Sequence, residues 1–267
     1  MAFELKPDYE ASRRRYEAFW EREIVDRALV SLPVPKASQT PVPERAYDSL
    51  RDRWLDVEFR AEQMATRLAN VEYLGDALPV AVPNMGPEIF SAWCGCPYHF
   101  GETTTWTDPV IENWDRDADD ATFDPEHPLF KATVRFTEAL LERGTGRFIV
   151  ALTDFHPGGD HLAALRDPQE LAIDMIEHRD AIKEKLATSA AEYFLAYDIF
   201  YEMLRGANMP ISSWLPLIHE GKYYIPSNDF SCMISTEMFE EVFLPGIIDE
   251  CRFLDRTIYH LDGPGAL

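Results

Sequence analysis

Three short segments of this 267-residue chain carry the side-chain types used by metal sites and acid–base catalysts. Each segment follows or accompanies a run of residues with high β propensity. The segments are Asp154-Phe155-His156 with Asp160 and His161, Asn228-Asp229 with Cys232, and His260-Leu261-Asp262. Imidazole, thiolate and carboxylate groups are the usual ligands of zinc and other divalent transition metals. The sequence therefore indicates a metal site or an acid–base site built from strand ends.

These groups can meet only if the strands before them lie parallel. In a parallel barrel the carboxyl ends of all strands open at one rim, so the three segments would share a pocket. None of them has the tight spacing of a self-evident metal motif. His260 and Asp262 fit a hydrogen-bonded pair that stabilises the rim about equally well. His156 and His161 fit a loop in which Asp160 caps the next helix about as well as they fit a ligand or base.

The four cysteines are too few and too scattered for a disulfide framework, so we expect reduced thiols. Cys94-Gly95-Cys96 has the spacing of a buried turn rather than of a metal-binding pair. Cys251 lies in an apolar helical pattern and is expected in the core. Cys232 is open to either interpretation.

Alternating strand and helix patterns are expected to position these residues. Helices are predicted at 9–27, 47–70, 127–143, 161–165, 168–177, 181–205 and 236–254, and strands at 26–35, 78–84, 147–154, 211–217 and 257–260. The alternation after Arg147 indicates β/α units and a parallel sheet. We find no internal repeat and no linker, so a single α/β domain over residues 1–267 is expected.

The composition limits the function. Lys and Arg total 25 against 47 Asp and Glu, which gives a formal net charge of −22. A surface this acidic repels nucleic acid and anionic lipid, so neither is expected as a partner. The N-terminal residues lack a secretory signal and no apolar run is long enough to cross a membrane, which indicates a cytoplasmic protein. The common nucleotide-binding and serine-hydrolase motifs are absent from the sequence.

Several segments together resemble the uroporphyrinogen decarboxylase superfamily over most of the chain. They are Tyr73-Leu74-Gly75-Asp76, Pro83-Asn84-Met85-Gly86-Pro87, Phe100-Gly101-Glu102-Thr103-Thr104-Thr105-Trp106, Ser235-Thr236-Glu237-Met238-Phe239 and His260-Leu261-Asp262-Gly263. The resemblance implies a (β/α)8 barrel of the TIM type, with an active site at the carboxyl ends of the strands. It also implies a chain with an N-terminal helical extension that lacks the last β/α units of the barrel.

The superfamily contains two chemistries. Its porphyrin decarboxylases carry an arginine-containing R-Q-A-G-R motif near the N-terminus, and nothing similar occurs in residues 1–40. The corrinoid-dependent methyltransferases resemble this chain more closely, and they hold zinc through H-x-C and a later cysteine. His260 matches that histidine, but Asp262 stands where the first cysteine would be. A carboxylate is a harder ligand that leaves zinc more Lewis-acidic, which suits transfer to or from oxygen or nitrogen better than thiol activation.

We therefore expect a methyltransferase that moves a methyl group between a small substrate and a corrinoid protein or similar carrier. The expected catalytic residues are Asp229, His260 and Asp262, the zinc ligands His260, Asp262 and Cys232, and the substrate-binding residues Asn84, Asp154, His156 and Tyr223. One alternative is a metal-free decarboxylase or lyase that acts on a small carboxylate. The other is a truncated, non-catalytic barrel that forms a homodimer through its open sheet edge.

Overall fold

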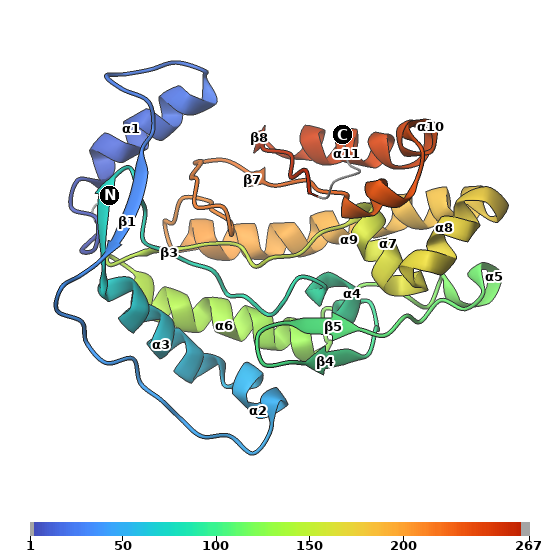
Figure 1. The fold of residues 1–267 in the computed structure, drawn as a ribbon, viewed down its shortest axis with the longest axis horizontal. Coiled ribbons are helices and arrows are strands. Elements are labelled where there is room, and N and C mark those ends of the chain that lie inside the picture. Colours follow the sequence, from blue (N-terminus) through green and yellow to red (C-terminus); the bar gives the residue numbers. More distant parts are fainter. Residues whose placement is uncertain (1–2, 263–267) are drawn as a thin grey trace. The chain divides into compact units, whose positions relative to one another are not determined.

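The computed structural model describes residues 3–262 and has a mixed α/β architecture (Figure 1). The chain divides into two compact units. Unit 1 comprises Met1–Asn84, Ala132–Thr153 and Phe200–Tyr223, and unit 2 comprises Met85–Lys131, Asp154–Ile199 and Tyr224–Leu267. Each unit is assembled from separated stretches, which explains why the sequence shows no linker. The single domain expected from the sequence stays a prediction.

Helices make up most of the regular structure. They are α1 (Tyr9–Trp20), α2 (Leu50–Leu55), α3 (Val57–Ala69), α4 (Ile89–Trp93), α5 (Trp114–Asp117), α6 (Pro128–Gly144), α7 (Gly158–Arg166), α8 (Pro168–Glu177), α9 (Arg179–Gly206), α10 (Thr236–Met238) and α11 (Leu244–Phe253). A 3-10 helix, η1 (Asp229–Met233), and a π-helical turn, η2 (Phe239–Phe243), lie in unit 2.

The strands are short and pair two by two. They are β1 (Ser31–Pro35), β2 (Val71–Gly75), β3 (Val80–Ala81), β4 (Tyr98–Phe100), β5 (Thr105–Thr107), β6 (Ile149–Val150), β7 (Tyr223–Tyr224) and β8 (Arg256–Thr257). Strand β1 pairs with β2 and β4 with β5 antiparallel, β3 pairs with β6 parallel, and β7 pairs with β8.

The α/β class expected from the sequence is confirmed, but residues 3–262 contain no sheet of more than two strands and no closed eight-stranded barrel. Proline is one physical reason. Pro79 and Pro83 flank β3, and Pro226 follows β7 closely. Proline has no N–H group to donate to a strand ladder, so it keeps such strands short.

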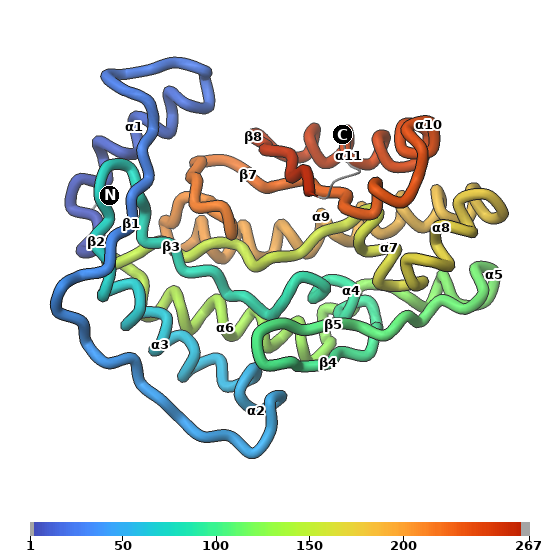
Figure 2. The backbone as a smooth tube through the Cα atoms, viewed as in Figure 1, coloured from blue at the N-terminus to red at the C-terminus, as the bar shows by residue number. Residues whose placement is uncertain are grey.

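Unit 1 begins with α1 and strand β1, and β1 pairs antiparallel with β2, which follows α3 in the chain. Figure 2 shows β1 and β2 side by side. The helix predicted at 9–27 ends at Trp20, and Arg22 adopts a left-handed backbone with φ 59° that a helix cannot continue through. The helix predicted at 47–70 is broken at Asp56, whose side chain accepts a hydrogen bond from Phe59 N at 3.3 Å and caps α3. Strand β2 occupies residues that the sequence patterns did not assign to a strand.

The core of unit 1 forms around α6, β3 and β6. Phe136 and Leu140 on α6 and Ile149 on β6 are fully buried, and burial of such side chains stabilises a fold by about 1.5–3 kcal/mol each. Helix α3 contacts α6 through Arg60, whose guanidinium group lies 4.6 Å above the centre of the Phe136 ring. The strand predicted at 211–217 is reduced to a bridge between Ile211 and His219.

Unit 2 is organised around an aromatic cluster that holds the segment after β6. The Phe155 ring lies 4.9 Å from the Tyr193 ring and 5.5 Å from the Tyr224 ring. The Tyr224 hydroxyl also accepts a hydrogen bond from Phe155 N at 3.0 Å. These contacts fix the backbone between Asp154 and His156. In the described part of the chain no helix has both the length and the apolar character required to cross a bilayer.

Candidate functional site

The backbone after β8 places His260 beside residues 224–227 of unit 2. Ile258 N donates to Tyr224 O at 3.4 Å, and His260 N donates to Pro226 O at 2.9 Å. Ser227 and His260 form a parallel β-bridge. The segment around His260 therefore runs parallel to residues 224–227, and this register places His260 next to the start of η1.

Asp229, His260 and Asp262 come together at this point. Each offers one ligand atom, and these atoms all lie within 4.8 Å of one another. His260 Nε2 is 3.9 Å from Asp229 Oδ1, with 34% of the His260 side chain and 49% of the Asp229 side chain exposed. Ligands on a single zinc ion bond at about 2.0–2.2 Å and so lie roughly 3–4 Å apart. Small side-chain rotations would bring these three atoms to that spacing.

Asp160 on α7 holds the segment that carries Asp229. Its Oδ2 atom accepts hydrogen bonds from Ser227 Oγ and Asp229 N, both at 3.1 Å, and its Oδ1 atom accepts one from Phe230 N at 2.9 Å. The sequence-based alternative, in which Asp160 caps the helix that follows it, is wrong. Asp160 lies inside α7, whose N-cap residue is Pro157 and whose N-terminus has no side-chain cap.

The charges around Asp229 favour a proton or a cation. Partial burial raises the pKa of the Asp229 carboxyl, and the negative charges of Asp160 and Asp262 raise it further, while His260 and His156 act in the opposite direction. A bound cation relieves the same repulsion between carboxylates that raises this pKa. Two carboxylates and one imidazole are a ligand set suited to zinc, with a coordination position left for substrate or water.

Asp154 and His156 form a second polar pair in unit 2. His156 Nε2 lies 2.8 Å from Asp154 Oδ1. Burial opposes the charged imidazolium, but the hydrogen bond and charge of Asp154, with the charges of Asp160 and Glu250, leave the pKa of His156 raised. The Asp154 carboxylate therefore favours the charged form of the His156 imidazole.

Three further predicted site residues are not members of the group of three. Cys232 is exposed on η1 and does not belong to that group. Asn84 and Tyr223 belong to unit 1. Asn84 O accepts a hydrogen bond from Arg60 Nη2 at 2.5 Å. Tyr223 is fully buried, and burial raises its pKa to about 12.

Other candidate residues have structural surroundings. His161 is buried with Nδ1 2.8 Å from Ser91 Oγ, and burial lowers its pKa to about 3, so it stays neutral in the core. Cys94 and Cys96 are buried as predicted. The prediction of a core position for Cys251 is wrong, because it lies on the exposed side of α11.

Sequence reasoning missed Glu250 on α11. It is 3% exposed, and burial raises the pKa of its carboxyl to about 8. A signal was present, because Glu250 shares a helical face with the buried residues Phe243 and Leu254. A glutamate on the apolar stripe of a helix marks a buried acid.

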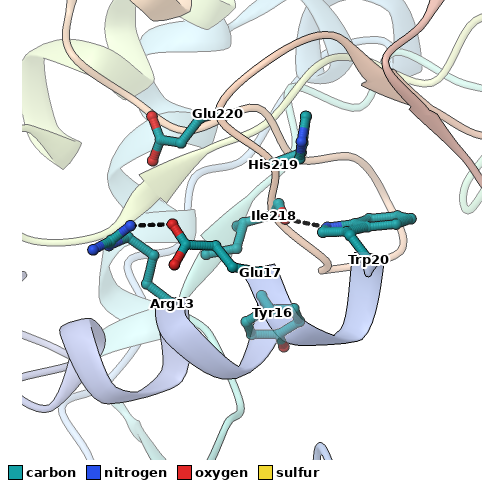
Figure 3. A pocket seen from close by; sticks show the side chains of 7 residues that line it. All are labelled: Arg13, Tyr16, Glu17, Trp20, Ile218, His219 and Glu220. Atoms are coloured by element: carbon teal, nitrogen blue, oxygen red, sulfur yellow. Dashed lines mark hydrogen bonds and ion pairs between the residues drawn. The ribbon is translucent and has the colours of Figure 1, made fainter. Parts of the chain in front are cut away.

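Unit 1 contains a separate pocket of about 100 Å³ between α1 and the 218–220 segment (Figure 3). Its charged side chains have partners: Arg13 pairs with Glu10 and Glu17, and Glu220 accepts a hydrogen bond from Arg205 at 3.0 Å. Trp20 Nε1 donates a hydrogen bond to Ile218 O at 2.8 Å, and the Trp20 side chain lines one wall of the pocket. Because its charged side chains are engaged in ion pairs, we do not assign a catalytic role to this pocket.

Comparison with solved structures supports the fold. A methyltransferase from Methanosarcina mazei is similar to this chain with a TM-score of 0.59 and 13% sequence identity, over 98% of this chain and 71% of that protein. No family model and no curated protein matches the sequence. At this identity the similarity describes the fold alone.

Proposed function

We propose that this chain is a metal-assisted methyltransferase that moves a methyl group between a small substrate and a corrinoid protein or similar carrier. The observation that carries this proposal is the grouping of Asp229, His260 and Asp262 within 4.8 Å. In this proposal Asp229 takes the position among the metal ligands that the sequence interpretation gave to Cys232. The resemblance to the uroporphyrinogen decarboxylase superfamily and the fold shared with a methyltransferase support it.

The proposed metal is zinc, held by one imidazole and two carboxylates. When bound, zinc supplies Lewis acidity that activates the oxygen or nitrogen atom receiving or releasing the methyl group. Asp160 keeps Asp229 in place through the backbone of η1, and the hydrogen bond to Pro226 O keeps His260 in register. Both hydrogen bonds are donated by backbone N–H groups, so they hold the backbone of Asp229 and His260 in place, and side-chain rotation adjusts the ligand atoms.

The polar pair Asp154–His156 is proposed to bind the substrate. The raised pKa of His156 favours its charged imidazolium form, which would attract an anionic or electron-rich group. We extend the proposal to a (β/α)8 barrel of which these strand ends form one rim. Such a rim is where enzymes of that fold place their chemistry.

A methyl-transfer assay tests this function. Methylcobalamin serves as the donor and a panel of small phenols, amines and thiols as acceptors, with consumption of methylcobalamin followed by absorbance. We expect turnover that stops on chelation, returns with zinc, and falls more than about 100-fold in H260A and D229N. The control is H99A, which removes another histidine of unit 2 that pairs with an aspartate. No methyl loss with any acceptor, or full activity in H260A, contradicts the proposal.

A metal-free decarboxylase or lyase is the second candidate. The raised pKa of Asp229 beside His260 favours it, because a carboxyl that holds its proton at higher pH serves as a general acid. Turnover of a small carboxylate that survives exhaustive chelation, and is lost in D229N, would favour this reaction over methyl transfer.

A further inference from the structure

A small cavity lies inside unit 2, behind the Asp160 loop. It is bounded by residues 157–159 before and within α7, by Ser227 and Asn228, and by Ile247 and Glu250 of α11. Its volume is about 20 Å³. A cavity of this size accommodates about one water molecule when its walls offer polar partners.

Two buried side chains provide such partners. Asn228 and Glu250 are each 3% exposed. Among residues 3–262, neither the Oδ1 and Nδ2 atoms of Asn228 nor the Oε2 atom of Glu250 has a hydrogen-bond partner from the chain. Buried polar groups are nearly always bonded, so three such atoms around one cavity point to a bound molecule.

The backbone is shaped to make room for Asn228. A Cβ atom on Gly159 would lie 2.0 Å from Asn228 Oδ1, which is closer than any side chain tolerates. Gly158 has φ +82°, a conformation that favours glycine. The Gly158-Gly159 pair is therefore required to seat the Asn228 amide against α7.

Glu250 has few charges nearby to compensate its own. Burial, followed by the negative charge of Asp160, raises the pKa of its carboxyl to about 8, and His156 acts in the opposite direction. Tyr193 and Tyr259 also respond to its charge, so the titratable groups that face Glu250 are His156, Asp160 and these two tyrosines. At neutral pH the carboxyl is mostly protonated, so its hydroxyl is able to donate a hydrogen bond.

The geometry points to a buried proton-holding site, in which one water molecule in the cavity is bonded by the Asn228 amide and by the neutral carboxylic acid of Glu250. Asn228 supplies both a donor and an acceptor, and Glu250 supplies a donor. Loss of the Glu250 proton would place a new negative charge near His156.

Infrared spectroscopy of the resting chain during a pH titration tests this site, since the C=O stretch of a protonated carboxyl is separate from that of a carboxylate. We expect one protonated carboxyl that persists at neutral pH, is lost near pH 8, and is missing in E250Q. The matched control, E240Q, changes an exposed glutamate and keeps the band. Titration of every carboxyl near pH 4–5, roughly the range of exposed groups, or a band that survives in E250Q, overturns the assignment.

A second variant tests the bound molecule and does not depend on the folding of E250Q. N228L keeps the size of the side chain and removes both amide atoms, so the midpoint of the Glu250 band should move to higher pH. A crystal structure should show one water within hydrogen-bond distance of both side chains. An unchanged midpoint, or a direct contact between Asn228 and Glu250, overturns the water site. Because both readouts use the resting chain, their outcome is independent of methyl transfer.

Discussion

Asp160 connects α7 to the segment that carries Asp229 through three accepted hydrogen bonds. Replacement by alanine leaves Ser227 Oγ and two backbone N–H groups without their acceptor. We expect D160A to lower the free energy of unfolding by about 1–3 kcal/mol and to weaken zinc binding. Urea denaturation measures the stability. D115A, at an exposed aspartate of the acidic segment, should stay within about 0.5 kcal/mol of the wild type. Equal losses in both variants would contradict the role of Asp160.

The raised pKa of Glu250 predicts a pH dependence of stability. Its pKa is about 8 in the folded chain against a usual value of 4.5. Below pH 4.5 the Glu250 carboxyl is protonated in both the folded and the unfolded chain, so its burial carries no cost of removing a charge from water. As the pH rises toward 8, the unfolded chain loses the proton while the folded chain keeps it, so the free energy of unfolding falls, by up to about 5 kcal/mol.

Denaturation of the wild type and E250Q across this pH range measures the effect. The wild type should lose stability as the pH rises, and E250Q should lose less of it. If the two curves run parallel, Glu250 does not hold a proton in the folded chain.

At the scale of the elements, alanine substitutions at two glycines, Gly159 of α7 and Gly246 of α11, test the contact between α7 and Asn228. In G159A the new Cβ atom meets Asn228 Oδ1 and displaces the amide, so we expect a loss of about 1–3 kcal/mol. In G246A, within α11, nothing lies within 4 Å of the new atom, and alanine should stabilise the helix by up to about 1 kcal/mol. Thermal unfolding distinguishes them. Destabilisation of G246A to the same extent would show that the Asn228 contact is not the cause.

The helices were predictable from the sequence to a larger extent than the strands. The periodic apolar residues of 127–143 and 181–205 lie within α6 and α9, because helical spacing is a local property. Strands such as Val80–Ala81 depend on a distant partner, here Ile149–Val150, and local patterns overestimate their length. The break at Asp56 carried a capping signal, but the pattern of apolar residues continued through it.

The candidate site likewise has features that the sequence predicts and features that depend on distant contacts. Asp229, His260 and Asp262 were predictable as a set because polar groups at strand ends meet when the strands run parallel, as the Ser227–His260 bridge does. The support from Asp160 depends on contacts with residues more than 60 positions away, and the cavity beside Glu250 is lined by several separate segments of unit 2. No local pattern carries that information. Cys232 illustrates the reverse error, since its position in the sequence is favourable but its side chain is not part of the group.

For the whole molecule, the net charge of −22 favours the binding of cations to the folded chain. A ligand that binds only the folded chain stabilises it by about 2.7 kcal/mol at 100 times its dissociation constant. Zinc at saturating concentration should therefore raise the melting temperature of the wild type, with no increase in H260A. A rise of the same size in H260A would assign the effect to acidic groups elsewhere on the surface.

Calorimetric titration of the full chain with zinc tests the central claim most directly. We expect the wild type and the H99A control to bind one zinc ion per chain, and D229N and H260A to bind it at least about 10–100-fold more weakly. Unchanged binding in both D229N and H260A, or no binding by the wild type, would contradict a metal site formed by Asp229, His260 and Asp262.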